Sequence, residues 1–383
     1  MSKIKYIITS LFLLVLGVTA VRSQDVKLLE RELSKAGFEQ VTVLPISKVK
    51  EEMHYKLGLE HRGMNNPLDI ILLAKAISKR LGFTNITYTL LLKGQVIFES
   101  SVDQNKLISN ILSDTYIRDF NRSYSLNKYR LNAFFSPEIK VRFGNFENPL
   151  QSKIDVILGT DLILFRGFSL FSGISIPISN DLDSRKKTIT LAPTFFEYFS
   201  QVFPGHFIQI STGLFFNNRY GVDSQYKYLH PKNNWSVGFR YAQTGFYYFP
   251  SSSIYIDPID DQLALFDFEF FFPRQRISTV LKAGQFLESD KGVRVELNKQ
   301  YRNIEVGFFS SYTESGSNSG FRFMLPLFPR KIIRTNSFEL RTDEAFRWEY
   351  AYSNEGLIAG NFNIGNSLAE KLRRFNSNFF NNY

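Results

Sequence analysis

Several segments in the C-terminal two-thirds of the chain alternate between apolar and charged residues. In 263–272 (LALFDFEFFF), four phenylalanines fall on one face, while Asp267 and Glu269 fall on the other. Segments 321–327 (FRFMLPL) and 346–352 (FRWEYAY) repeat this arrangement, with arginine or glutamate opposing large apolar side chains. Side chains alternate along a β-strand with a period of two residues. The pattern therefore predicts strands with one strongly apolar face and one water-facing face.

From residue 130 to 365 the chain is predicted to consist almost entirely of strands joined by short polar turns. The pattern gives roughly 12–16 strands. The predicted strands are 138–146, 153–166, 168–178, 187–199, 206–217, 220–229, 235–243, 263–272, 277–286, 292–300, 302–312, 319–327, 335–341, 345–353 and 356–364.

Alternation by itself allows either a soluble β-sandwich or a membrane β-barrel. The inward charges have both signs, the apolar faces are long and rich in aromatics, and no predicted helix could cover the sheet. We therefore expect residues 129–366 to form an antiparallel transmembrane β-barrel with a salt-bridged lumen. The residues expected to line this lumen are Arg240, Asp267, Glu269, Arg294, Glu296, Glu305, Arg322, Arg347 and Glu349.

Residues 24–128 have a different pattern, typical of a small α/β domain followed by a linker. Segment 25–38 is amphipathic and predicts a helix. Asn66-Pro67 predicts the start of a second helix that runs to Leu81, because a capping asparagine before a first-turn proline is a strong start signal. We expect this domain to be periplasmic. Its predicted strands are 41–46, 53–60, 85–92 and 95–101, the last two forming a hairpin about Lys93-Gly94.

The two ends of the chain carry separate signals. Residues 1–23 predict a cleaved signal peptide, with a basic start, an apolar run and small residues before Gln24. The run is shorter than the roughly 20 residues of a spanning helix. No later segment approaches that length, so insertion into a membrane would require strands. At the other end, 367–374 predicts a helix within a C-terminal tail, 367–383, and the pattern leaves the placement of this tail open.

The composition supports an exported barrel protein and limits the classes of molecule expected as partners. Aromatic residues make up 16% of the chain, which is typical of a barrel with a lipid-facing band. The absence of cysteine excludes disulfides, thiolate metal ligands and a lipid-modified N-terminal cysteine. The net charge of +10 becomes +7 without Lys3, Lys5 and Arg22, and it is spread along the chain. Nucleic acid is therefore not an expected partner, whereas an anionic polysaccharide fits better.

Residues that could carry catalysis or hold a metal do not form a known motif. The four histidines, His54, His61, His206 and His230, lack the spacing of a metal site and are expected to be isolated and exposed to solvent. A hydrolase could pair His206 with Ser200 or Ser211, but no Gly-x-Ser-x-Gly turn is present.

Two further sets of charged residues have a functional and a structural interpretation. Asp267 and Glu269 share a face and could act as a glycosidase acid and base, but we expect them to pair with arginines such as Arg294. We therefore expect no catalytic residue, no metal and no cofactor. Segment 282–294 predicts a tight hairpin in which Gly292 supplies a positive φ. The hairpin would place three residues at one rim, where they could contact a sugar or a partner protein: Glu288, Asp290 and Lys291.

Several segments, taken in order, resemble the YjbH/GfcD family. The resemblance implies an outer-membrane β-barrel associated with the secretion of exopolysaccharide and group 4 capsule, with no known catalytic residues. This chain departs from the family in two ways. Members of the family are longer, and some are lipoproteins, whereas this chain has no cysteine that could carry a lipid. The similar segments are 58–77, 167–183 (GFSLFSGISIPISNDLD), 219–229 (RYGVDSQYKYL), 235–245 (WSVGFRYAQTG), 282–299 (KAGQFLESDKGVRVELNK) and 319–327.

Taken together, the residues and the resemblance lead us to expect a non-catalytic outer-membrane β-barrel protein of a Gram-negative-type bacterium. It would take part in the secretion or assembly of exopolysaccharide or capsule. Its expected partners are outer-membrane lipid, anionic polysaccharide and periplasmic proteins of the export machinery. The alternatives are a porin-like or structural surface barrel and an outer-membrane hydrolase acting on lipids or glycans.

Overall fold

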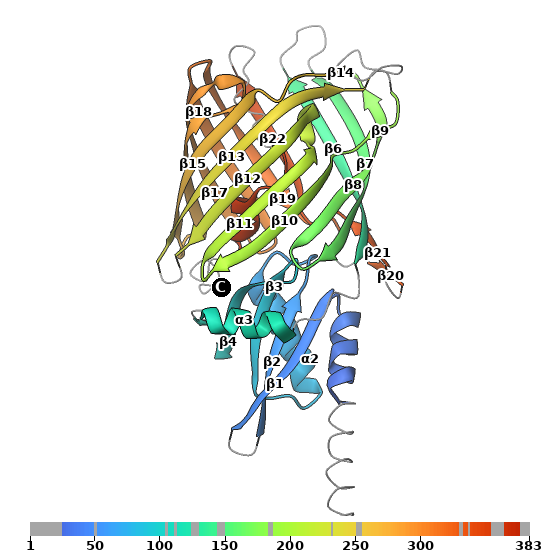
Figure 1. Cartoon of the computed structure of the whole chain (residues 1–383), viewed down its shortest axis with the longest axis vertical. Helices are drawn as coiled ribbons and strands as arrows, with labels where there is room; N and C mark the ends of the chain where they lie inside the picture. The colour runs from blue at the N-terminus through green and yellow to red at the C-terminus, as the bar shows by residue number, and fades with distance from the viewer. Residues whose placement is uncertain are drawn as a thin grey trace, which may run out of the picture.

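The structure is mainly β and contains two sheets, a small one near the N-terminus and a large one that follows it (Figure 1). It is a computed structural model. The predicted signal peptide and nearly all of the predicted strand 356–364 lie outside the residues it describes. The described residues are 25–49, 52–103, 106–110, 113–123, 130–143, 150–182, 187–230, 233–249, 255–328, 332–335, 338–353 and 364–375.

The small sheet has five strands in sequence order, and β2 and β3 are its one parallel pair among the described pairings. Helix α2 (Pro67–Arg80) makes the crossover between these two strands. The Asn66 side chain caps it by accepting a hydrogen bond from Leu68 N at 3.0 Å, as the sequence predicts. Strand β5 was not predicted. The strands are β1 (Gln40–Val49), β2 (Glu52–Glu60), β3 (Ile86–Leu92), β4 (Gln95–Asp103) and β5 (Lys106–Asn110).

Both faces of the small sheet are covered by helices. Helical segment 25–35 and α2 pack on one face around Leu57 and Leu90. Helix α3 (Asp114–Ser123) packs on the other face around Leu91. Its Phe120 ring lies directly over Gly58, where a Cβ would come within 2.5 Å of the ring, so only glycine permits this close approach.

The large sheet is a long antiparallel run that begins at β6 and ends at β22, with β8 pairing with β10 and β19 with β22. A parallel pair joins β21 to the start of β6. The main strands are β6 (Leu131–Phe143), β7 (Leu150–Phe165), β8 (Phe168–Asn180), β10 (Thr194–Phe203), β11 (His206–Leu214), β12 (Arg219–Leu229), β13 (Trp235–Tyr248), β15 (Asp261–Phe272), β16 (Ile277–Gln285), β17 (Lys291–Tyr301), β18 (Ile304–Thr313), β19 (Gly316–Leu325), β21 (Phe338–Thr342) and β22 (Phe346–Ser353). Three short strands accompany them: β9 (Thr190–Leu191), β14 (Tyr255–Ile256) and β20 (Ile333–Arg334).

The large sheet curves strongly, so it has an inner and an outer face (Figure 1). Strand β15 shows how side chains divide between them: Phe266 is 52% exposed on the outer face, whereas Glu269 is fully buried on the inner face. The same alternation runs through β10 to β18. The predicted mainly β, antiparallel architecture is thus confirmed. Among the described helices, none is long and apolar enough to cross a membrane.

The C-terminal segment 364–375 lies against the inner face of the large sheet. Its helix α4 (Leu368–Arg373) is capped by the side chain of Ser367 and coincides with the predicted helix 367–374. Figure 1 shows this dark red helix among the strands rather than outside them. Ile364 packs in an inner-face apolar cluster with Phe195 and Leu263, while Leu372 belongs to a second cluster nearer the N-terminal domain.

The small domain and the large sheet share one apolar core. Phe199, Phe207 and Phe271, from the inner face of the large sheet, join the cluster that holds Leu29 and Leu57 of the small domain. Phe375, after α4, belongs to the same cluster. The small domain therefore packs against one end of the large sheet, and the C-terminal segment joins the same core.

Candidate functional site

The inner face of the large sheet carries ion pairs between side chains of different strands. Arg240 on β13 donates to Asp223 on β12 through Nε at 2.9 Å and Nη2 at 2.7 Å. Lys227 on β12 pairs with Asp267 on β15 and lies 3.7 Å from Glu269. Arg240 is paired with Gln225 and reaches Asp223 diagonally, whereas Lys227 reaches Asp267 across Gly238 of the intervening strand β13.

A second set of ion pairs occupies the inner face from β16 to β22. Glu296 accepts from Lys282 at 2.6 Å and from Arg294 at 2.8 Å. Arg294 also reaches Glu349 on β22 at 3.1 Å. Arg322 lies within 3.2 Å of Glu296. Buried charges are tolerated when they are paired, and each charge of this set has a partner of opposite sign.

Helix α4 is held in the middle of these charges. Arg373 donates to Glu269 at 2.5 Å and to Glu305 at 2.7 Å. Glu370 accepts from Arg322 at 2.7 Å. Lys371 donates to the buried Glu197 at 2.8 Å, which attaches the helix to strand β10 as well. The ion pairs of α4 thus reach strands β10, β15, β18 and β19.

The backbone before α4 is gripped by amide side chains. Gln209 and Gln225 each donate to the carbonyl oxygen of Asn366 at 2.8 Å. Gln225 also accepts from Leu368 N at 2.8 Å through its carbonyl oxygen. The last of these bonds satisfies Leu368 N, one of the amides that the first turn of a helix leaves without a partner.

The small domain reaches into the same set of charges through the β3–β4 turn. Lys93 Nζ donates to Glu197 and to Ser169, both at 2.7 Å, so Glu197 holds one lysine from the domain and one from α4. Burial lowers the pKa of Lys93, but Asp161 and Glu197 outweigh that effect and raise it. Lys93 is thus held as a cation. A second link joins Arg374, after α4, to Asn65 of the domain.

The opposite side of the domain is attached by a buried cluster of carboxylates and arginines. Glu39 accepts from Arg341 of β21 at 3.2 Å and lies 3.7 Å from Arg334. Burial raises the pKa of Glu39 to about 8, and Glu339 adds to the effect, although the arginines oppose it. Burial and the same arginines lower the pKa of His61 to about 4, so this histidine is neutral.

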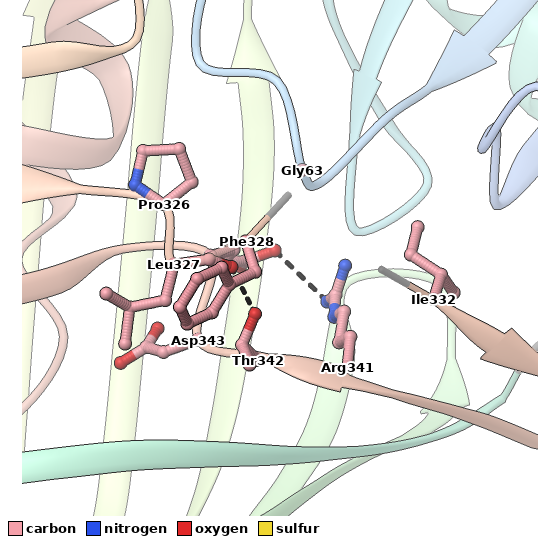
Figure 2. A pocket seen from close by; sticks show the side chains of 9 residues that line it. Gly63, Pro326, Leu327, Phe328, Ile332, Arg341, Thr342 and Asp343 are labelled. Carbon is pink, nitrogen blue, oxygen red and sulfur yellow. Dashed lines mark hydrogen bonds and ion pairs between the residues drawn. The ribbon is translucent and has the colours of Figure 1, made fainter. Parts of the chain in front are cut away.

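A narrow pocket lies beside this cluster, between the segment after β19 and the end of β21 (Figure 2). Its walls are tied together, because Thr342 donates to the carbonyl of Leu327 and Arg341 donates to Glu344 at 3.1 Å. Asp343, in the same wall, accepts from Ser136 at 2.6 Å. The pocket holds no arrangement of a nucleophile and a base. We therefore place the candidate site in the charged interior.

Each residue that the sequence assigned to the lumen has its partner on the inner face or on α4. One detail of the prediction is wrong. Arg294 pairs with Glu296 and Glu349, whereas Asp267 pairs with Lys227 and Glu269 with Arg373. Sequence reasoning also missed seven residues of this set: Glu197, Asp223, Lys227, Lys282, Glu370, Lys371 and Arg373.

Some of the missed residues carried a usable signal. Asp223 and Lys227 alternate with Tyr226 and Tyr228, so 220–229 shows the same division of faces as β15. Glu197 lies between inward Phe195 and Phe199, which hide it in an apolar run. For α4, no local pattern indicates that a polar helix returns to the interior.

The predicted rim hairpin differs from expectation in its turn geometry and at Asp290, whereas Glu288 and Lys291 are exposed there. Glu288 has the positive φ that was assigned to Gly292, and it pairs with Arg219 at 3.0 Å. Asp290 is buried and accepts from Ser315 N at 3.0 Å, so it is not available as a surface contact. Lys291 begins strand β17. Gly292 is needed for another reason, since a Cβ there would lie 2.3 Å from the carbonyl oxygen of Tyr312.

The candidate histidines and serines do not come together. His206 lies on the outer face, where Nδ1 is 2.8 Å from the Tyr226 hydroxyl, whereas Ser211 is fully buried on the inner face of the same strand. His61 is buried against Phe38, so the prediction that it is exposed to solvent is wrong. His54 bonds to the Thr87 hydroxyl at 2.9 Å. In the part of the chain that the structure describes, no cluster of histidine and carboxylate side chains could hold a metal ion.

The fold and this interior define a mainly β protein whose large antiparallel sheet is apolar outside and charged inside. The sequence matches the YjbH family, described as exopolysaccharide biosynthesis protein YbjH, over residues 110–323. The chain belongs to this family, as the resemblance in the sequence indicated.

Comparisons with curated proteins and with solved structures add little to this assignment. No curated protein matches the chain. Among solved structures, it is similar to OmpTdeltaL8, a loop L8 deletion mutant of OmpT, an outer membrane protein of Vibrio cholerae. The identity is 6%, the match covers 51% of this chain and 85% of that one, and the TM-score is 0.27. The description of the fold therefore rests on the strand pairings alone.

Proposed function

We propose that the large sheet is a closed β-barrel in the outer membrane and that the protein serves, without catalysis, in the secretion or assembly of exopolysaccharide. The observation that carries the membrane part is the outer face. Large apolar side chains lie exposed there on successive strands, and a soluble protein rarely leaves such an area uncovered. Representative exposed residues are Phe196, Ile210, Val222, Phe239, Phe266, Leu281, Val295, Phe308 and Phe321.

An aromatic cluster at one end of the outer face fits a membrane boundary. His206 and Tyr228 have ring centroids 4.5 Å apart, and His230 and Trp235 are 4.9 Å apart. Tyr228 links the two pairs by its contact with Trp235. Amphipathic rings of this kind are enriched where a membrane barrel meets the headgroup layer. The cluster lies at the turns nearest the small domain, which we accordingly place in the periplasm.

The polysaccharide part of the proposal rests on membership of the YjbH family. A periplasmic domain joined to the barrel gives such a protein a surface for partners of the export machinery. Export by a cleaved signal peptide belongs to the same proposal. The porin-like alternative would share the barrel and lack the effect on polysaccharide.

Two measurements test the proposal. The protein should fractionate with the outer membrane and migrate differently on gels with and without heating, as folded membrane barrels do. A soluble product with unchanged migration would contradict the barrel. Deleting the chromosomal copy should lower the amount of exported exopolysaccharide, and re-expression should restore it. Unchanged export in a strain whose deletion is verified would remove the polysaccharide role and leave the porin-like alternative.

A further inference from the structure

We propose that segment 364–375 is a releasable plug, and that the interior it vacates is a water-filled passage selective for cations. The inference rests on the proposed function, because it takes the large sheet to be a barrel in a membrane. It adds an activity, the gated conduction of ions, and a preference for cations.

The segment lies across the enclosed space rather than along one wall. At one end, Ile364 packs among apolar inner-face residues that include Phe215 and Phe286. At the other end, Leu372 and Phe375 belong to the core shared with the small domain. Between these ends, α4 contacts β10, β15, β18 and β19 through its charged side chains. A segment with partners on several sides blocks the route between the two apolar clusters.

The way the segment is attached allows it to leave. Among the described residues, one backbone hydrogen bond, from Phe216 N to Ile364 O at 2.8 Å, joins it to the large sheet. Its remaining polar contacts with the sheet involve side chains, so its departure breaks no strand pairing. Helix α4 spans six residues, and a helix of that length is not stable by itself in water. The wall therefore holds the segment in place and would survive its loss.

The wall is also suited to water once the segment has left. The groups that hold α4 are carboxylates, arginines and amides, and water can satisfy each of them. Ion pairs within the wall, such as Arg240 with Asp223 and Lys282 with Glu296, do not involve the segment. An apolar cavity would stay dry and collapse, whereas a charged wall of this kind stays hydrated and open.

Charge determines the expected selectivity. Lys371, Arg373 and Arg374 outweigh Glu370, so the segment is a net cation. Among the described residues that form ion pairs on the inner face of the sheet, the carboxylates below outnumber the cations. A wall with excess negative charge concentrates cations. The carboxylates are Asp155, Asp161, Glu197, Asp223, Asp261, Asp267, Glu269, Glu296, Glu305 and Glu349. The cations are Lys153, Arg219, Lys227, Arg240, Lys282, Arg294, Arg322 and Arg347.

The small domain is coupled to this plug. Glu197 holds Lys93 of the domain and Lys371 of α4 on the same carboxylate group, and Arg374 bonds to Asn65 of the domain. Moving the domain away from the sheet breaks these contacts at both places. A periplasmic partner that displaces the domain would therefore loosen the plug.

Single-channel recording in planar lipid bilayers tests the inference with the full chain. The K371E/R373E variant reverses two charges that face Glu197, Glu269 and Glu305, and so should expel the segment by repulsion. The wild type should remain mostly closed, and the variant should show sustained currents. In a KCl gradient, the reversal potential should shift toward the potassium equilibrium potential.

Two controls make the result specific. K79E/R80E reverses two exposed charges at the end of α2 and should stay closed like the wild type. The chain has no cysteine, so a cleavable cross-link between N366C and Q225C can hold the segment in place in the K371E/R373E background. Currents should appear only after the link is cleaved.

The outcomes separate this inference from the proposed function. A K371E/R373E protein that inserts, keeps its heat-modifiable migration and shows no current would overturn the plug. A current that prefers chloride would overturn the cation selectivity. Failure of the wild-type protein itself to insert into bilayers or to fractionate with the outer membrane would instead overturn the barrel on which both proposals depend.

Discussion

At the scale of single residues, the attachment of the small domain depends on groups that are buried with incomplete charge compensation. Glu39 and Glu339 share Arg334 and Arg341 in a buried cluster, and Glu39 retains its proton to about pH 8. His61, nearby, is neutral down to about pH 4. The effect of His61 lies mostly below pH 6.5, so above that pH the stability should respond mainly to Glu39.

We expect the stability of the folded protein to fall as the pH rises from 6.5 to 8. The pKa of Glu39 is raised in the folded state, so its stabilising effect is complete below its unfolded value and is lost as the pH approaches 8. Over that interval the change is at most about 2 kcal/mol. His61 is neutral in the folded state over this interval, and its unfolded form loses its remaining half proton just above pH 6.5, which raises the stability by only about 0.4 kcal/mol. Scanning calorimetry in detergent should show the decrease for the wild type and a flatter profile for Glu39→Gln.

Glu32 provides the matched control for this measurement. It is on the surface of the same domain, in ion pairs with Lys35 and Arg80. Glu32→Gln should keep the wild-type decrease between pH 6.5 and 8. If Glu39→Gln kept it as well, the buried cluster would not be its source.

At the scale of elements, β15 combines the three environments of the molecule in one strand. Its even-numbered phenylalanines face outward, Asp267 and Glu269 face the charged interior, and Phe271 reaches the core shared with the small domain. A strand can do this because successive side chains point to opposite faces, and the surroundings of each side chain depend on its position along the strand. The loss of stability caused by a substitution on the outer face should therefore depend on its position along the strand.

We expect Phe266→Arg to destabilise the membrane-inserted protein more than Phe272→Arg. Both side chains are exposed on the outer face, but Phe266 is in the middle of β15 and Phe272 is at its end. An arginine costs about 2–4 kcal/mol at the bilayer midplane and about 0–1 kcal/mol near the interface. Equilibrium unfolding by guanidinium from lipid vesicles measures the difference. Equal, small effects at the two positions would argue that the outer face does not meet lipid.

At the scale of the whole molecule, the small domain, the large sheet and segment 364–375 form a single unit. One apolar core contains residues of all three, and Glu197 accepts from lysines of two of them. The turn between β7 and β8 adds a contact with the small domain, since Gly167 N donates to the carbonyl oxygen of Lys93 at 2.8 Å. The domain is thus built into one end of the sheet rather than tethered to it.

Because the core is shared, truncating a residue of the large sheet should destabilise the small domain. Phe271→Ala removes a fully buried ring from this core and should cost about 3–5 kcal/mol. Hydrogen exchange in strands β1 to β4 should become faster in this variant. The neighbouring Phe272→Ala, which alters only the outer face, should leave that exchange unchanged. Unchanged exchange in Phe271→Ala would show that the domain folds independently of the sheet.

The sequence by itself determined the class of elements and the division of faces. Strand periodicity separated Phe266 from Glu269, and the Asn66-Pro67 signal placed the start of α2, because both patterns arise from local geometry. The tertiary structure alone decided which charges meet. Arg294 was matched to the wrong strand, Glu197 was hidden between phenylalanines, and α4 gave no local indication that it returns to the interior. These contacts join residues far apart in the chain, and their energies depend on register, burial and the curvature of the sheet rather than on any local pattern.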